Sequence, residues 1–285
     1  MNDSTPNLTT IDHVQSGEIA VLGIPFDENS SFLRGPALAP ERIRQALFSY
    51  SANLWTENGT DLETASNWQL LADLDLADAT TAFANIENTI GDLLQRGARV
   101  LSLGGDHSIT YPILRAYAAA FGELTILQLD AHPDLYDELD GNRFSHACPF
   151  ARIMEEKLAA RLVQVGIRTL TGHQKQQAHR FDVEQFEMKN EFRIEELQLD
   201  GPVYLSLDMD CLDPAFAPGV SHHEPGGMST RDVLTIIQNL GGNLVGADIV
   251  ELNPQRDPTG ITEMAAAKLL KEIIARMLEE NSSTP

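Results

Sequence analysis

Three short segments carry side chains that could bind metal ions, and each follows an apolar run typical of a β-strand. They are Gly104–His107, Asp130–Asp134 and Asp208–Asp210. In an extended chain alternate residues share a face, so the acids and imidazoles of one segment can point at the same place. The paired glycines of the first segment allow the backbone to turn sharply. The spacing therefore predicts that three strand ends meet at one site.

Six side chains in these segments are candidate metal ligands, namely four carboxylates and two imidazoles. They are His107, Asp130, His132, Asp134, Asp208 and Asp210. A set rich in oxygen and free of thiolate favours manganese over a structural zinc, and it is also compatible with nickel or cobalt. A single aspartate at a strand end is commonly a turn residue, but four clustered acids repel one another unless cations neutralise them. Two divalent ions about 3.5–4 Å apart activate a water molecule, so the predicted chemistry is metal-assisted hydrolysis.

These motifs resemble the signatures of a known enzyme family. The sequences GGDHS at 104–108, DAHPD at 130–134 and SLDMDCLDP at 206–214 are similar to segments of the ureohydrolases, which include arginases and agmatinases. The likeness runs from about Val21 to Met277. It looks closest to plant-type arginases and agmatinases, through the segments 29–35, 145–147, 150–154, 210–222 and 253–257. The resemblance implies an arginase-like fold with a central, mainly parallel sheet.

The resemblance also implies a role for each candidate ligand. One manganese ion would be held by His107, Asp130, Asp134 and Asp208. The other would be held by Asp130, His132, Asp208 and Asp210, so that two aspartates bridge the pair. Two further positions match functional residues of the family, His146 as a proton shuttle and Glu251 as the partner of a substrate guanidinium. The family forms symmetric oligomers, which implies a homotrimer or a homohexamer.

A small cationic guanidino compound is the substrate that the resemblance implies. An activated water attacks the guanidinium carbon, and Asp134 accepts its hydrogen bond and takes up its proton. Glu251 binds the cation through a charge-assisted hydrogen bond. His146 is of the residue type suited to passing a proton to the leaving amine near neutral pH. The products would be urea and the amine.

The far end of the substrate is predicted from fewer residues. Tyr136, Phe144 and Thr171 stand where animal arginases carry polar residues that bind the amino acid head. This difference favours agmatine as the lead substrate, with L-arginine in a plant-type arginase reaction or another guanidino acid as the alternative. Arg34 is the candidate to bind a carboxylate, if the substrate has one. A catalytically silent partner subunit is an alternative of another class, although such a chain would be expected to lack some of the ligands.

The composition of the chain limits the kinds of partner that it can bind. The 285 residues include 42 acids and 20 bases, which gives a formal net charge of −22. That charge argues against nucleic acid and anionic membranes as partners, and it would attract a cationic substrate. The polar start of the chain and the lack of a long apolar run predict a cytoplasmic protein. Cys148 and Cys211 are expected to stay reduced. The pair His222–His223 could rim the pocket, but solvation at the surface is the favoured expectation.

Apolar runs alternate with helical patterns, which predicts a three-layer α/β/α fold around a parallel sheet. Predicted strands are 18–23, 100–103, 124–129, 203–207 and 245–250, and predicted helices are 40–47, 82–95 and 265–278. The charged segments 52–65 and 184–201 are predicted to be loops. We expect one domain over residues 16–280, with tails at 1–15 and 281–285. The ligands would then lie at strand ends, where open α/β sheets keep their sites.

Overall fold

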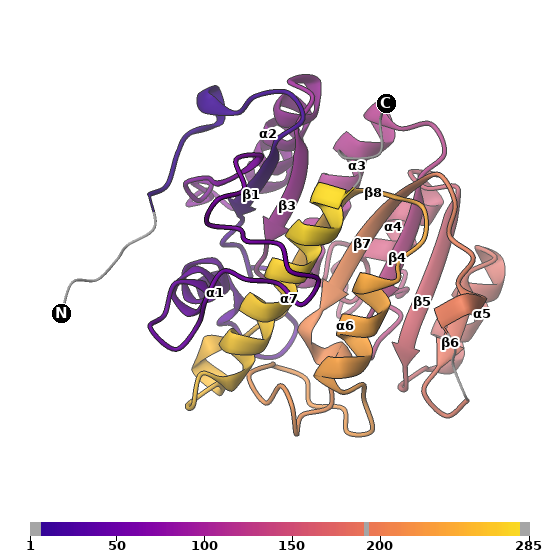
Figure 1. Ribbon diagram of the computed structural model, residues 1–285. Coiled ribbons are helices and arrows are strands. Elements are labelled where there is room, and N and C mark those ends of the chain that lie inside the picture. Colours follow the sequence, from indigo (N-terminus) through magenta and orange to yellow (C-terminus); the bar gives the residue numbers. More distant parts are fainter. Residues whose placement is uncertain (1–6, 191–193, 280–285) are drawn as a thin grey trace.

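A computed structural model describes residues 7–190 and 194–279, which fold around one eight-stranded parallel sheet (Figure 1). The strands lie side by side in the order β2-β1-β3-β8-β7-β4-β5-β6. Their bounds are β1 Ile19–Gly23, β2 Trp68–Leu70, β3 Arg99–Leu103, β4 Thr125–Leu129, β5 Arg161–Ile167, β6 Glu184–Glu187, β7 Pro202–Asp208 and β8 Asn243–Val250. The strands predicted from apolar runs correspond to β1, β3, β4, β7 and β8.

Helices cover both faces of this sheet, as the predicted α/β/α fold requires. Their bounds are α1 Ala39–Leu47, α2 Ala82–Gln95, α3 Thr110–Ala120, α4 Pro149–Glu155, α5 Gly172–Arg180, α6 Thr230–Gln238 and α7 Ile261–Glu279. The first, sixth and seventh pack together on one face, and the second, third and fourth pack on the other. Figure 1 shows α6 and α7 in front of the sheet.

Inner strands contribute to two apolar cores, one beneath each helical layer. On β4, Leu127 and Leu129 belong to the core under α1, α6 and α7, whereas Ile126 belongs to the opposite core. Every residue of this strand is buried. Inner strands of a parallel sheet are covered on both faces, so their sequences are mostly apolar instead of alternating with polar residues. This is the pattern by which they could be predicted.

The edge strand β6 was not predicted, because the segment 184–201 was expected to be a loop. Among the described strands β6 pairs with β5 alone. Its residues are half-buried or exposed, so it lacks the apolar run that marks the inner strands. The segment 52–65, also expected to be a loop, contains turns and no named helix or strand. The short edge strand β2 and the inner strand β5 were not predicted either, although β5 is buried along most of its length.

The predicted tails fall partly outside the described residues, which begin at residue 7 and end at residue 279. Within the first fifteen residues, the Thr9 N–H donates to the Leu70 carbonyl over 2.9 Å, and Val14 is buried in the core. Residues 9–14 therefore pack on the folded body. None of the described helices is long and apolar enough to cross a membrane.

The four central strands bring the candidate ligands together. β3, β8, β7 and β4 are consecutive neighbours in the sheet. The three ligand segments lie at or just beyond the carboxyl ends of β3, β4 and β7. Since parallel strands end at the same edge, the chain order of the sheet converts three distant sequence motifs into one cluster.

Candidate metal centre

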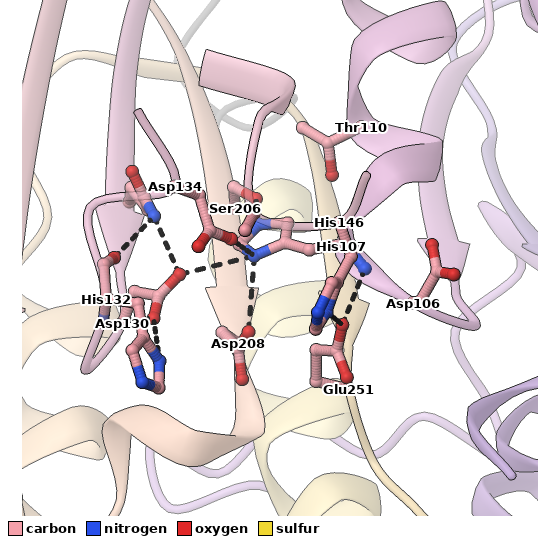
Figure 2. A network of polar contacts seen from close by, with 12 residues as sticks. Asp106, His107, Thr110, Asp130, His132, Asp134, His146, Ser206, Asp208 and Glu251 are labelled. Carbon is pink, nitrogen blue, oxygen red and sulfur yellow. Dashed lines mark hydrogen bonds and ion pairs between the residues drawn. The ribbon is translucent and has the colours of Figure 1, made fainter. Parts of the chain in front are cut away.

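His107 stands at the middle of a first cluster of ligands, with three carboxylates around its Nδ1 atom (Figure 2). Nδ1 lies 3.2 Å from an oxygen of Asp130, 3.0 Å from Asp134 and 3.2 Å from Asp208. All four side chains are buried. Donor atoms that share an octahedral ion with bonds of about 2.1 Å are about 3 Å apart, so this spacing suits one divalent cation.

A second cluster shares Asp130 and adds the other two candidate ligands, His132 and Asp210. His132 Nδ1 lies 2.9 Å from Asp210 Oδ2 and 3.6 Å from Asp130 Oδ1. The two oxygens of Asp130 thus face different clusters, Oδ2 toward His107 and Oδ1 toward His132. Asp208 belongs to the first cluster, and its Oδ1 accepts the Asp210 N–H over 2.7 Å.

Local hydrogen bonds explain why the loops take this shape. The carboxylate of Asp130 accepts the N–H of His132 over 2.6 Å, two residues further along, as the carboxylate of Asp208 does from Asp210. Aspartates commonly close turns in this way. Asp134 has a φ of 49°, in the left-handed region that residues with a Cβ seldom adopt. Backbone strain of this kind clusters at functional sites.

The glycine pair before His107 is required by a close approach of two chain segments. A Cβ on Gly105 would lie 1.7 Å from the Phe26 carbonyl oxygen. The Gly105 carbonyl in turn accepts the N–H of Glu251, at the end of β8, over 2.9 Å. Any larger residue would push these segments apart, so the pair fixes the position of His107 relative to Glu251.

The protonation of His107 fits a metal ligand. Its Nε2 is 2.9 Å from the Ser206 hydroxyl, and that hydroxyl donates its only proton to Asp248 over 2.7 Å. Nε2 therefore carries a proton, which leaves Nδ1 to take either a metal ion or a second proton. This buried atom makes no hydrogen bond of good geometry. Burial opposes a charge on the ring, but Asp130, Asp134 and Asp208 outweigh burial and raise the pKa of His107 well above its ordinary value, so the surroundings of Nδ1 favour a cation.

The pKa values of the ligand carboxylates also fit a metal site. Burial raises the pKa of Asp134 to about 6, with the charge of Asp130 adding to the effect. Burial and the charge of Asp210 also raise the pKa of Asp208 well above its ordinary value. Burial also opposes ionisation of Asp130, but the imidazoles of His107 and His132 outweigh burial and lower the pKa of that carboxyl. Buried acids resist ionisation unless positive charge compensates them in this way. The described residues thus fit a metal site made of oxygen and imidazole donors.

His146 and Glu251 form a pair beside the first cluster (Figure 2). His146 Nδ1 lies 2.7 Å from Glu251 Oε1, and its Nε2 lies 2.8 Å from the Ser31 hydroxyl. Burial opposes protonation of this imidazole, but the Glu251 carboxylate outweighs burial and raises the pKa of His146 to about 9. Glu251 Oε1 also accepts the His107 N–H over 2.9 Å, and its own φ is 63°. The sequence indicated both residues but not their direct contact.

A cavity of about 200 Å³ opens over the second cluster and the His146–Glu251 pair. Its lining residues are Ser31, His132, Asp134, Tyr136, Leu139, His146, Ala147, Thr169, Thr171, Gln174, Asp208, Asp210, His222 and Glu251. His222 was expected to be a solvated surface residue. Instead it is half-buried in this lining, with its ring centre 5.2 Å from that of His146 and 6.0 Å from that of His132. His223 is exposed, as expected.

Arg34 is not brought to the cavity with the other predicted site residues. Its guanidinium is largely exposed and pairs with Glu28. Phe144 is also absent from the described lining, whereas Tyr136 and Thr171 belong to it. Ser31 and His222 were given no role in the site from the sequence, and they reach the cavity because loops far apart in the chain meet there. The sequence signals for them were the family-like segment 29–35 and the histidine pair at 222–223.

Comparison with known proteins decides the family. A profile of the arginase family matches residues 17–275. The chain belongs to the arginase family. It is 48% identical over 275 residues to Arginase 1, mitochondrial, of Arabidopsis thaliana, an alignment that covers 90% of this chain and 80% of that one. It is 37% identical over 273 residues to the agmatinase of Neisseria meningitidis serogroup C, which covers 89% and 85%.

The solved structures agree with this assignment. The arginase from Medicago truncatula superposes with a TM-score of 0.87 at 43% identity and covers 92% of this chain and 88% of that one. The α/β/α arginase fold and the ureohydrolase class, both predicted from the motifs, are therefore confirmed. Among the relatives named here, the plant arginases are more similar to this arginase-family chain than the agmatinase is.

Proposed function

We propose that this enzyme hydrolyses L-arginine to L-ornithine and urea, with two Mn²⁺ ions as its metal centre. The observation that carries the proposal is the greater similarity to plant arginase, 48% identity against 37% to agmatinase over nearly the same share of the chain. L-Arginine thereby replaces agmatine, which the loop residues had favoured, as the lead substrate. All six ligands stand in the two clusters, which argues against a catalytically silent subunit.

The ligand assignment extends the observed clusters. His107, Asp130, Asp134 and Asp208 would hold one ion, and Asp130, His132 and Asp210 would hold the other, with Asp208 as a second bridge. When bound, such a pair supplies Lewis acidity and lowers the pKa of water enough for attack at neutral pH. The Asp134 carboxylate, placed at the edge of the cavity, would accept the hydrogen bond of the attacking water and then its proton.

Glu251 and His146 would act on the substrate itself. Glu251 Oε1 already accepts hydrogen bonds from His107 and His146, which leaves Oε2 for a guanidinium N–H. His146 has a pKa raised to about 9, so it is protonated at neutral pH and can give a proton from Nε2 to the departing amine. Ser31, whose hydroxyl contacts Nε2, lies in the cavity lining and would orient this transfer.

Agmatine is the second candidate because of the cavity lining. Within the described residues, the lining contains no lysine or arginine that could pair with the carboxylate of arginine. Thr169, Thr171 and Gln174 instead offer hydroxyl and amide groups, which can bind a carboxylate or leave room for a substrate without one. L-Arginine and agmatine differ only in that carboxylate, so the lining residues that would face it decide which of the two substrates is preferred.

The test is urea release by manganese-loaded protein offered L-arginine, agmatine and 4-guanidinobutyrate in parallel. We expect kcat/KM to be highest for L-arginine and to vanish in Asp210→Asn. A higher value for agmatine would transfer the proposal to that substrate. No urea from any of the three, with two ions bound, would reject the proposed function.

The oligomeric state and location stay predictions. We propose a homotrimer or homohexamer, to be measured by light scattering during gel filtration; a monomeric mass would reject both. A cytoplasmic location was expected from the polar start of the chain. The Arabidopsis relative is named mitochondrial, so fractionation of the source cells is the measurement that decides.

A further inference from the structure

One polar side chain from each of six neighbouring strands lies in a single row across the sheet. We call these residues the polar row: Ser102, Asp248, Ser206, Gln128, Gln164 and Gln185, which are successive register partners from β3 to β6. The first five are at most 1% exposed. Burying polar groups costs free energy unless they are hydrogen-bonded, so a row of them inside a sheet calls for an explanation.

The glutamine half of the row leads to Asp130. Gln128 Nε2 donates to Asp130 Oδ2 over 2.7 Å and to the His132 carbonyl over 3.1 Å. Gln164 Nε2 donates to Gln128 Oε1 over 2.6 Å, and Gln185 Nε2 donates to Gln164 Oε1 over 2.7 Å. Three side-chain amides on β4, β5 and β6 are therefore linked head to tail.

The direction of this chain is dictated by its acceptors. An ionised Asp130 can only accept, so Gln128 must present its NH₂ group there and turn its carbonyl oxygen toward Gln164. The carbonyl oxygen of Gln128 must then accept a hydrogen bond from the NH₂ group of Gln164. The same NH₂ group donates to the Pro133 carbonyl over 2.7 Å. The same argument orients Gln185. No amide in the chain can flip without placing two acceptors against each other.

The contacted oxygen is the one that matters for the metal centre. Oδ2 of Asp130 faces His107 and the first cluster, whereas Oδ1 faces His132 and the second. Rotation of this carboxylate would disturb both clusters. A rigid donor on Oδ2 prevents that rotation, and the chain of amides holds the donor in place.

We propose that Gln128, Gln164 and Gln185 are positioning residues that fix the Asp130 carboxylate for metal binding, Gln128 by direct contact and the other two by orienting Gln128. The proposal rests on the metal centre of the proposed function and not on the identity of the substrate. Outer partners of metal ligands typically contribute about 10–100-fold to metal affinity.

The test measures Mn²⁺ affinity of the metal-free protein by isothermal titration with a competing chelator. Gln128→Met and Gln164→Met each remove an amide and keep an unbranched side chain of similar length. Gln177→Met is the matched control, because Gln177 is also buried but lies on α5 and contacts Arg180. Melting temperatures of the metal-free proteins show whether each variant folds.

We expect Gln128→Met to lower Mn²⁺ affinity about 10–100-fold and Gln164→Met to lower it by a smaller factor, while the control stays within about twofold. Gln164 orients Gln128 and also donates to the Pro133 carbonyl, so the double variant should lose less affinity than the sum of the two single losses. Additive losses, or an unchanged affinity in Gln128→Met, would overturn the proposal.

Two further outcomes are separable. If Gln128→Met does not fold, the test rests on the Mn²⁺ affinity of Gln164→Met compared with that of Gln177→Met. Equal affinities of these two variants would reject the positioning role of the three glutamines. If the parent protein itself binds no Mn²⁺, the metal centre of the proposed function fails, and this inference fails with it. A parent that binds two ions alongside unaffected glutamine variants rejects this inference alone.

Discussion

The floor and the rim of the cavity are built by different means. The floor consists of the six metal-ligand candidates, which follow strand ends and are held by backbone N–H groups and by the polar row. The rim, which we define as Ser31, Tyr136, Leu139, Thr169, Thr171, Gln174 and His222, is assembled from separate loops and the start of α5. In the proposed function the floor would determine what reaction is performed, and the rim on which molecule.

The largest expected effect comes from breaking the floor at the residue shared by both clusters. Asp130→Asn removes a charge that faces His107 and His132 together. We expect arginine hydrolysis to fall at least about 10³-fold and bound manganese to be lost, because the metals contribute several kcal/mol to the barrier. Urea release and metal analysis measure this. Asp140→Asn, in an exposed loop, is the control. If Asp130→Asn kept a tenth of the activity, the prediction would be wrong.

The next effect concerns the pair that joins floor to rim. The Glu251 carboxylate raises the pKa of His146 to about 9, above its ordinary 6.5, so the folded state binds this proton more tightly than the unfolded state does. The resulting stability is complete below about pH 6.5 and is lost as the pH rises through about 9.

We therefore expect the metal-free protein to lose about 3 kcal/mol more between pH 6 and pH 10 than His146→Asn does. Urea denaturation across this range measures the difference, with the same substitution at the exposed His179 as the control. Parallel pH profiles for the parent and His146→Asn would show that the pair carries no such linkage.

A smaller effect is expected at the rim. His222→Ala should change the ratio of kcat/KM for arginine and agmatine by about 5–30-fold, since one pocket contact is worth about 1–2 kcal/mol of discrimination, and should leave manganese affinity unchanged. His223→Ala, next in the chain but exposed, is the matched control. Equal losses on both substrates together with loss of metal would move His222 from the rim to the floor.

The smallest effect is expected at Arg34, which lies outside both regions. Because this exposed guanidinium already pairs with Glu28, Arg34→Ala should change kcat/KM by less than about twofold for either substrate. A loss confined to arginine would restore Arg34 as the partner of the substrate carboxylate, the role expected from the sequence.

The floor was predictable because its residues fall in three short motifs, each at the end of an apolar run. Asp130, His132 and Asp134 lie within five positions after an apolar run, and a strand followed by a turn fixes their direction. The parallel sheet then places such segments at one edge. The inner strands β1, β3, β4, β7 and β8 could be found because burial on both faces leaves an apolar signature, whereas the inner strand β5, whose sequence includes Arg161 and Gln164, was missed.

The rim and the polar row depend on contacts that the sequence does not display. Ser31 touches His146 across more than a hundred residues of chain. Gln128 stood inside a predicted strand, but nothing there indicated that Gln164 and Gln185 lie beside it. The edge strand β6 also escaped prediction because pairing with a single neighbour demands little apolar surface. The residue types could be read from the sequence, but the register of the strands and the contacts between distant loops could not, and both were needed to predict the rim and the polar row.

The place of β8 in the sheet has a consequence for how the protein is made. It is the last strand in the described part of the chain, yet it lies between β3 and β7. Until residues 243–250 are synthesised, the sheet can exist only as two separate pieces, with His107 on one and the aspartate ligands on the other. Insertion of this strand closes two exposed edges and delivers Glu251 in the same event. A nascent or truncated chain that ends earlier would be both prone to aggregation and inactive.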